Sequence, residues 1–301
     1  MEDAVNILVA TDFSENSMAA VRWGAFLANQ LGSDMTLMNA VDLASGDSAW
    51  RVLVETPEEI ERQAVDESRQ RLETFLDEAV DERPEKTRFV SVLGSPTEQI
   101  LSEAESLEDP ILVVGTRGAS RLKEFLLGNT ARRLVRASLF PVILVPPNAE
   151  VSRPRELVVG VDFSEASREA IRRAALMART YDASVRVVYG YVLPEVATFD
   201  GSMASVASEQ VDLVSEREEA LSNMVEEVGA SDVVNVVEAL QLPPAQAITT
   251  VAERANAQFV FVGTHGRRGL SRFFLGNTAE RVMRKSPCAI FVVPVESREN
   301  D

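Results

Sequence analysis

The chain has 301 residues, of which 46% are hydrophobic and 26% charged, and its formal net charge at pH 7 is −17. A chain of this length can build two domains of ordinary size, each with a hydrophobic core of its own. The negative charge excludes nucleic-acid backbones and anionic membranes as expected partners, since binding either one requires a basic surface.

The cysteine content and the N-terminal residues bear on the cellular compartment. Cys288 is the only cysteine, which excludes an intrachain disulfide and any cysteine-based metal cluster. Glu2 and Asp3 stand where a secretory signal would carry basic residues, and no apolar run approaches the ~18 residues of a membrane span. We therefore expect a soluble, cytoplasmic protein.

The first half of the chain alternates short apolar runs with helical patterns. Buried strands are predicted at 6–11, 35–41, 88–93, 111–115 and 141–145. The first predicted helix begins at Ser14 or Ser17, either of which can cap it, and ends at Gly32. Further helices are predicted over about 57–82, 97–106 and 131–137. Strands separated by helices in this way indicate right-handed crossovers and a parallel sheet covered on both faces.

The same pattern begins again after residue 154. Asp162-Phe163-Ser164-Glu165 repeats Asp12-Phe13-Ser14-Glu15 at an offset of 150 residues, and strands are predicted at 157–161, 185–192, 232–240, 259–262 and 289–293. A near-constant offset over the whole length indicates a duplicated domain. We expect a first domain at 1–147, a linker at 148–154, a second domain at 155–296 and a tail at 297–301.

One segment, Pro194 to Ser208, is small, polar and aperiodic. A plain loop has this character, and so does a lid over a binding site. The sequence therefore predicts no regular element here.

A glycine loop follows the fourth strand of each repeat. The first copy reads Gly115-Thr116-Arg117-Gly118 and then Gly128-Asn129-Thr130; the second reads Gly263-Thr264-His265-Gly266 and then Gly276-Asn277-Thr278. Glycines at the carboxyl end of a parallel strand let main-chain N–H groups approach an anion, and the helix that follows directs its positive dipole end to the same place. This order predicts a phosphate cradle.

A structural interpretation of the same loops stays open. The glycines would then shape strand-to-helix turns, and Asn129 and Asn277 would cap the helices that follow. Asn277 and Glu280 have the spacing of a capping box, although Asn fits that motif imperfectly.

Catalytic motifs are sparse. His265 is the single histidine, and its counterpart in the first copy is Arg117, so imidazole chemistry cannot be common to both sites. The chain contains no Gly-x4-Gly-Lys-Ser/Thr stretch, which removes the P-loop NTPases. We expect no catalytic residue and no metal ion held by protein ligands alone.

The combination of a strand ending in Asp-Phe-Ser with Gly-x2-Gly-x9-Gly before the last helix resembles the universal stress protein (UspA) family, over both halves of the chain. The resemblance implies an α/β fold of two tandem, doubly wound, five-stranded parallel sheets, Rossmann-like and related to the adenine-nucleotide α-hydrolases. It also implies that the two domains pair through their fifth strands as a pseudo-dimer.

ATP-binding members of that family imply a set of site residues here. The first-strand aspartate lies beside the nucleoside, main chain at the end of the second strand contacts adenine, and the glycines line the ribose and phosphates. The matching positions are Asp12, Ala40, Gly115, Gly118 and Gly128 in the first copy, and Asp162, Gly190, Gly263, Gly266 and Gly276 in the second. The family's motif continues with Ser or Thr, whereas Asn129 and Asn277 follow here, with Thr130 and Thr278 one position later.

Three functions remain open on this reading. The first is a non-catalytic, ATP-binding sensor for stress, with Mg²⁺ arriving on the nucleotide and an unknown protein partner downstream. The second is an interaction protein that has lost nucleotide binding. Asn129 and Asn277, which stand where the family has Ser or Thr, support this alternative. The third is a weak ATP hydrolase. Dimerisation of whole chains is left open.

Overall fold

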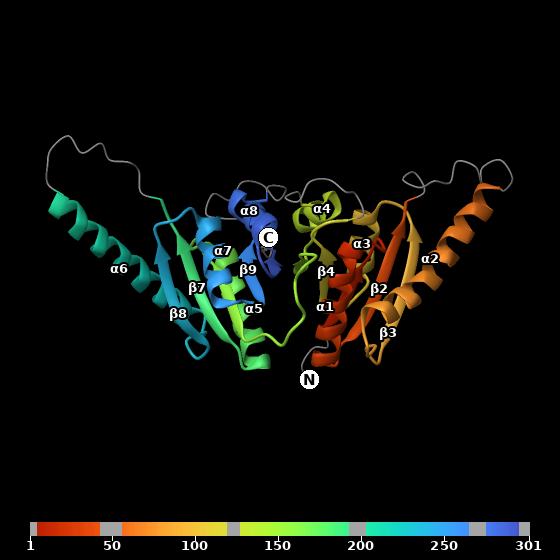
Figure 1. The fold of residues 1–301 in the computed structure, drawn as a ribbon, viewed down its shortest axis with the longest axis horizontal. Coiled ribbons are helices and arrows are strands. Elements are labelled where there is room, and N and C mark those ends of the chain that lie inside the picture. Colours follow the sequence, from red (N-terminus) through yellow and green to blue (C-terminus); the bar gives the residue numbers. More distant parts are fainter. Residues whose placement is uncertain (1–4, 43–55, 119–126, 193–202, 265–274, 295–301) are drawn as a thin grey trace, which may run out of the picture. The chain divides into compact units, whose positions relative to one another are not determined.

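The computed structural model describes residues 5–42, 56–118, 127–192, 203–264 and 275–294, and of 203–213 it describes the backbone alone. The chain divides into two compact units, Met1–Val151 and Ser152–Asp301. Each unit alternates strands and helices (Figure 1), as the repeated sequence pattern predicts.

The elements of the first unit are β1 (Asn6–Ala10), α1 (Glu15–Leu31), β2 (Asp34–Val41), α2 (Pro57–Ala79), β3 (Thr87–Leu93), α3 (Pro96–Glu105), β4 (Pro110–Gly115), α4 (Asn129–Ala137) and β5 (Val142–Val145). Those of the second are β6 (Glu156–Gly160), α5 (Glu165–Tyr181), β7 (Ser184–Gly190), α6 (Met203–Glu227), β8 (Val234–Leu240), α7 (Pro244–Ala255), β9 (Phe259–Gly263), α8 (Asn277–Lys285) and β10 (Ala289–Val293).

Within the first unit the strands are parallel and lie in the order β3-β2-β1-β4-β5. Within the second unit the order is β8-β7-β6-β9-β10, again parallel. The chain moves outward from the first strand of each unit, then returns to its other side. The doubly wound α/β fold predicted from the sequence is therefore confirmed.

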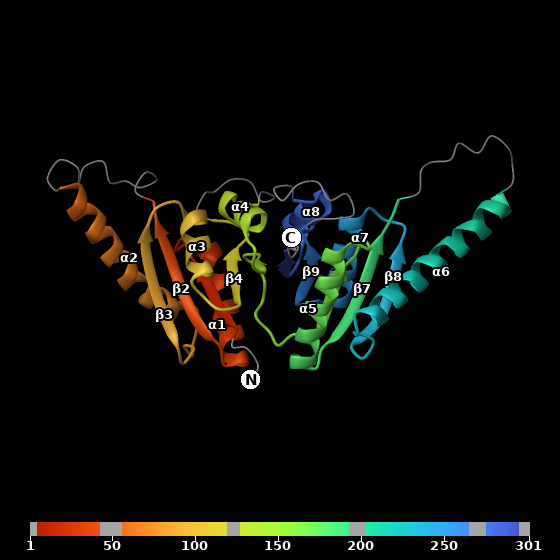
Figure 2. The ribbon, with the colours of Figure 1, turned by 180° about the vertical axis from the view of Figure 1, so that it is seen from behind.

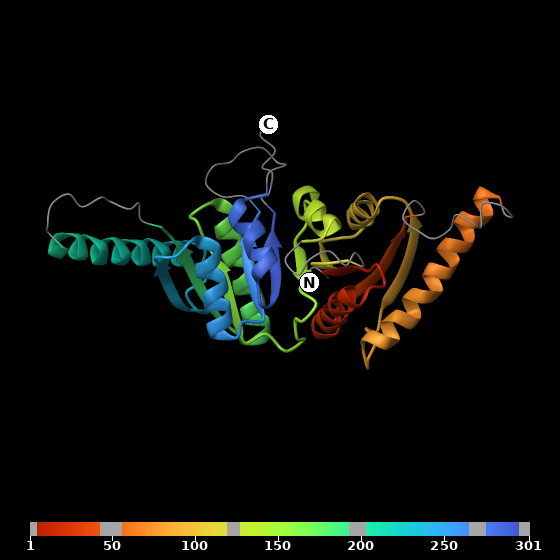
Figure 3. The ribbon, with the colours of Figure 1, turned by 45° about the horizontal axis from the view of Figure 1, so that its top comes forward.

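Helices cover both faces of each sheet. In the first unit α1 and α2 contact each other and one face, while α3 and α4 form the other layer (Figure 3). Figure 1 and Figure 2, views from opposite sides, show α5 and α7 on opposite sides of the β6–β10 sheet. The centre of each sheet is apolar throughout; Val9, Leu37 and Val113, level with one another on β1, β2 and β4, are all 0% exposed.

The first helix of each unit begins as its local sequence dictates. Ser14 is the N-cap of α1 and its side chain accepts from Ser17 N, and Ser164 does the same for α5 with Ser167 N. Gly32 closes α1 in the left-handed conformation, with φ 62°, which glycine adopts at little cost. Of the two predicted caps for α1, Ser14 is therefore the one used.

The prediction of an irregular Pro194–Ser208 is wrong at its C-terminal end. Helix α6 begins at Met203, while 194–202 lie outside the described residues. Met203 and the two alanines that follow it have good helix propensity, and helix formation propagates backward from the periodic part of α6 without needing an apolar stripe of its own. None of the described helices is long and apolar enough to cross a membrane.

Candidate functional site

The site lies where each sheet changes winding direction. The chain leaves β1 toward β2 on one side, and leaves β4 toward β5 on the other, although Ala10 and Val114 are paired at the ends of these two adjacent strands. Diverging connections leave the carboxyl ends of such strands open, which is where ligands bind in doubly wound sheets. The β6 and β9 strands form the equivalent point in the second unit.

Asp12 stands at the end of β1 and is fixed by the first turn of α1. Its Oδ1 accepts hydrogen bonds from Ser14 N at 3.1 Å and Ser14 Oγ at 2.5 Å. Between them Phe13 has φ 60°, a left-handed conformation that is strained for an aromatic residue. Phe163 repeats it with φ 64°, so both copies hold the same strained turn beside the candidate aspartate. Strain repeated at one position is a reason to suspect function there.

The glycine loop meets Asp12 at Gly118. A Cβ atom on Gly118 would lie 2.7 Å from Asp12 Oδ2, so a larger residue at this position would require the carboxylate to shift away from the main chain. Gly115, the last residue of β4, is in similar contact with main-chain atoms at the start of α1, because a Cβ there would lie 3.2 Å from Asn16 O. At these two predicted glycines the loop main chain therefore lies in close contact with the end of β1 and the start of α1.

The end of the loop is closed in the same way in both copies. Gly128 N donates to Thr116 O at 2.7 Å, and Gly276 N donates to Thr264 O at 3.0 Å. Gly128 and Gly276 are then the N-cap residues of α4 and α8, in extended conformation and with no side-chain cap. The first bond inside α4 runs from Arg132 N to Gly128 O, so the N–H groups of residues 129–131 have no partner within the helix. Such groups can receive an anion.

The predicted capping role of Asn129 and Asn277 is wrong. Both residues are already the first residue of their helix, because the glycine before each one takes the N-cap position. Glu280 consequently falls one position too late for a capping box with Gly276. Both asparagines are exposed, and Thr130 and Thr278 beside them are half-buried.

Ala40 and Gly190 offer main chain at the ends of β2 and β7. Thr11 N donates to Met38 O, so residue 38 faces β1, and Ala40, two residues on, faces the same way past the last paired position of β1. Val161 N donates to Val188 O, which orients Gly190 likewise toward β6. A Cβ on Gly190 would lie 2.5 Å from Pro244 Cα, so its glycine is also needed for packing against α7.

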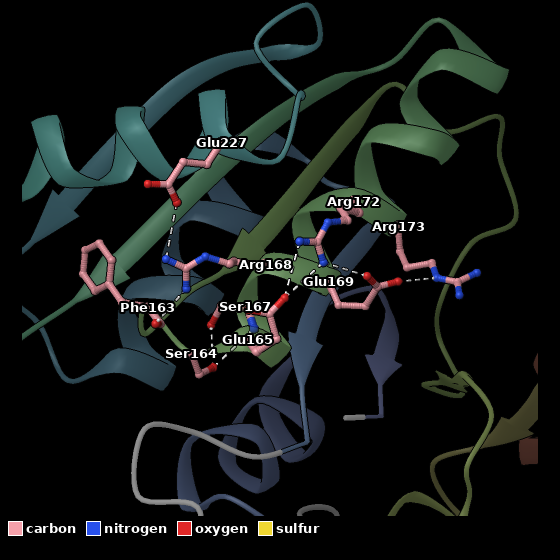
Figure 4. A network of polar contacts seen from close by, with 9 residues as sticks. All are labelled: Phe163, Ser164, Glu165, Ser167, Arg168, Glu169, Arg172, Arg173 and Glu227. Carbon is pink, nitrogen blue, oxygen red and sulfur yellow. Dashed lines mark hydrogen bonds and ion pairs between the residues drawn. The ribbon is translucent and has the colours of Figure 1, made fainter. Parts of the chain in front are cut away.

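The second copy holds Asp162 by a different set of hydroxyls. Asp162 Oδ1 accepts from Ser164 N at 3.1 Å and from Ser167 Oγ at 2.7 Å. Figure 4 shows the surroundings: Arg168 donates to Phe163 O at 3.2 Å and reaches Glu227 of α6 at 3.4 Å. The carbonyl of the strained Phe163 is thus held by a side chain of α5.

The predicted residues fall into three groups. Those that the structure brings together around the end of β1 are Asp12, Gly115, Gly118 and Gly128, with Asn129 and Thr130 at the helix start behind them. Asp162, Gly263, Gly276, Asn277 and Thr278 hold the same positions in the second unit. Gly266 and His265 lie outside the described residues.

Other residues at this site were not predicted from the sequence. Asn39 Nδ2 donates to Thr11 O at 2.7 Å, Ser68 Oγ donates to Asn39 Oδ1 at 2.9 Å, and Asn16 Nδ2 donates to Gly118 O at 3.2 Å. Aligning the two repeats would have drawn attention to these positions, since Tyr189 and Ala166 replace the two asparagines.

Two tandem doubly wound domains, each with an aspartate after its first strand and a glycine at the end of its fourth, define a duplicated α/β protein with a Rossmann-like fold. The universal stress protein family model matches residues 5–146 and again 154–294. The chain belongs to the universal stress protein family and carries two of its domains.

Relatives share this organisation over nearly the whole chain. A universal stress protein of Mycolicibacterium smegmatis is 28% identical over 95% of this chain and 96% of its own length, and one of Mycobacterium tuberculosis H37Rv is 27% identical with the same coverage. A universal stress protein of Methanocaldococcus jannaschii is 33% identical over 48% of this chain and 85% of its own. The crystal structure of a universal stress protein from Archaeoglobus fulgidus matches with a TM-score of 0.67 at 22% identity, covering 98% of this chain and 97% of that one, which shows the shared fold.

Proposed function

We propose that each domain binds ATP at the carboxyl end of its sheet, and that the protein works as a nucleotide sensor in the response to stress. The observation that carries this proposal is the contact between the Asp12 carboxylate and the Gly118 main chain, beside a helix start without a side-chain cap. A carboxylate accepts hydrogen bonds from ribose hydroxyls, and free N–H groups at a helix start receive phosphate oxygens.

The described residues fit the parts of the ligand in order. Ala40 main chain would meet the adenine edge, Asp12 the ribose, and the loop from Gly115 to Gly118 with the α4 N–H groups the phosphates. Asn129, where the family pattern has Ser or Thr, offers an NH₂ donor at the same end, and Thr130 offers a hydroxyl. Mg²⁺ would arrive with the nucleotide, whose phosphate oxygens are ligands that this ion prefers.

We favour a sensor over a hydrolase because of the hydrogen bonds that Asp12 makes. Its Oδ1 is engaged by Ser14, which suits a fixed acceptor better than a proton shuttle. Slow hydrolysis is tested by phosphate release: steady turnover that falls in Asp12→Ala and Asp162→Ala would establish an enzyme, and binding without turnover supports the sensor.

One observation favours a second candidate, a protein that interacts through its surface without nucleotide. Asn129 and Asn277 are both exposed, and Asn129 Oδ1 accepts from Arg132 of its own helix at 3.1 Å. This bond directs the Asn129 side chain toward Arg132 of its own helix, an arrangement that serves the helix surface as well as it would a phosphate. The pairing of the domains through β5 and β10, and the downstream partner, stay predictions in either case.

The decisive experiment is a calorimetric titration of ATP and Mg²⁺ into the full chain. Asp12→Ala and Asp162→Ala should each remove one of two binding events. Asp34→Ala is the matched control, since Asp34 is an exposed carboxylate at the opposite end of β2, paired with Lys86 at 3.3 Å. Glycine variants are less suitable: a Cβ on Gly263 would lie 2.5 Å from Ala166 Cβ, so lost binding could reflect lost packing.

A further inference from the structure

The two candidate sites differ at four related positions. An offset of 150 residues places Val161, Ala166 and Tyr189 of the second domain at Thr11, Asn16 and Asn39 of the first. Aligning the fully buried Leu72 of α2 with Leu221 of α6 places Arg217 at Ser68. All four polar side chains of the first domain are replaced, which sets the two sites apart.

In the first domain Thr11, Asn39 and Ser68 form a buried chain of hydrogen bonds with Ser17. Ser68 Oγ bonds Asn39 Oδ1, Asn39 Nδ2 bonds Thr11 O, and Thr11 Oγ1 lies 2.8 Å from Ser17 Oγ. Thr11 Oγ1 also accepts from Phe13 N at 3.0 Å. Each residue in this chain of hydrogen bonds is at most 9% exposed. The hydrogen bonds therefore connect α2, β2, the end of β1 and α1 within the protein interior.

Asn16 makes a further hydrogen bond, which joins the start of α1 to the glycine loop. Its Nδ2 donates to Gly118 O at 3.2 Å, across 102 residues of sequence. Gly118 is the residue whose main chain lies against Asp12. The amide therefore holds together the two halves of the proposed nucleotide site, the end of β1 and the loop after β4.

The second domain cannot make these bonds. Val161 has no hydroxyl, and Ser167 Oγ is instead bonded to Asp162, as donor to Oδ1 and as acceptor from Asp162 N at 3.0 Å. Ala166 has no donor to reach the loop. At the end of β7 the centres of the Tyr189 and Phe163 rings lie 5.1 Å apart. The Arg217 guanidinium carbon lies 4.1 Å from the centre of the Tyr191 ring.

From this difference we infer that the first domain binds ATP more tightly than the second, and that Asn16 is the positioning residue responsible. The inference rests on the proposed function. A loop already fixed in its bound geometry loses less conformational entropy on binding. One hydrogen bond of this kind corresponds to an affinity difference of about 5-fold.

The test uses full-length proteins with a single working site each. Asp162→Ala leaves the first domain to be titrated with ATP and Mg²⁺, and Asp12→Ala leaves the second. The first-domain protein should bind about 5-fold more tightly, and adding Asn16→Ala should remove that advantage. Asn29→Ala is the matched control: Asn29 also lies on α1 and its amide also donates to a main-chain oxygen, that of Glu82 at 3.3 Å, far from the loop in sequence.

A second readout separates positioning from general stability. Hydrogen exchange of the amides from Gly115 to Gly118 should become faster in Asn16→Ala and stay unchanged in Asn29→Ala. If Asn16→Ala fails to fold, as judged by its circular dichroism, the similarly sized Asn16→Leu removes the donor without adding charge.

The outcomes are distinguishable. Equal affinity of the two single-site proteins, or the same ATP affinity in Asn16→Ala as in Asn29→Ala, would overturn this inference and leave the proposed function standing. The absence of saturable binding in the wild-type chain would overturn the proposed function and this inference with it.

Discussion

Oδ2 of Asp12 lies 2.7 Å from the point at which a Cβ atom on Gly118 would stand. The end of the first strand and the loop after the fourth are therefore in direct contact, although 106 positions separate the two residues in the printed sequence. The contact depends on the missing side chain of glycine, which leads to a simple test.

Gly118→Ala should displace the Asp12 carboxylate and weaken ATP binding by about 10-fold, while the melting temperature changes little because Asp12 is exposed and can move. The titration uses the Asp162→Ala background, in which only the first site binds ATP. Unchanged ATP affinity in Gly118→Ala would contradict a carboxylate positioned against this main chain.

Ser68→Ala should destabilise the first domain by about 1–3 kcal/mol, since it leaves the buried Oδ1 of Asn39 without its donor. Urea unfolding measures the change. Ser222→Ala is the control, because the Ser222 hydroxyl bonds Glu218 O on an exposed surface of α6 and its loss should cost under about 0.5 kcal/mol. Equal effects of the two variants would contradict the buried hydrogen-bond chain.

The Cys288 thiol should be unreactive in the folded protein. Burial raises its pKa to about 12, and its side chain lies at the start of β10 with 8% of its surface exposed. At pH 8 the thiolate fraction should then be about 1,000-fold lower than in the unfolded chain, whose thiol has the ordinary pKa of 9.0. Labelling by a thiol-specific disulfide reagent should follow unfolding, and rapid labelling of the native protein would show that β10 opens locally.

Helix α2 should lose protection in acid. The Thr56 main-chain N–H and, to a smaller extent, the Thr56 hydroxyl donate hydrogen bonds to the Glu59 carboxylate. These bonds hold the pKa of Glu59 below the ordinary 4.5. Because the folded pKa is the lower one, the stabilisation is present above pH 4.5 and is lost as the pH falls through the folded pKa. Amide exchange in the first turn of α2 should rise over that window, corrected for intrinsic rates. Glu59→Ala should remove the pH dependence, and an unchanged profile would contradict the capping box.

Local chemistry made much of the fold predictable. Ser14 and Gly32 are readable as helix ends because capping requires one side chain or one φ angle. The Asp-Phe-Ser sequence, which follows the first strand of each repeat, marked both switch points. The alternation of strands and helices left few possible topologies for each domain. The helical conformation of 203–208 was missed because this part of α6 has no helical spacing of apolar residues. A helix that propagates from a neighbouring segment does not require such spacing.

The contacts within the site were harder to predict than its members. Asp12 and Gly118 could be named separately, but the bond from Asn16 to Gly118 spans 102 residues and follows only from the packing of α1 on β4. The structural interpretation of the asparagines after Gly128 and Gly276 as caps is wrong because one residue of shift in a helix start changes their role. That shift depends on the Thr116 and Thr264 carbonyls, which bind the glycine N–H groups.

The most direct test of the account is the number of ATP molecules bound per chain at saturation, measured by equilibrium dialysis in the presence of Mg²⁺. The duplicated site predicts two for the wild-type chain, one for either Asp12→Ala or Asp162→Ala, and none for the double variant. Binding that persists in the double variant, or a wild-type chain that binds none, would contradict nucleotide binding at the ends of β1 and β6.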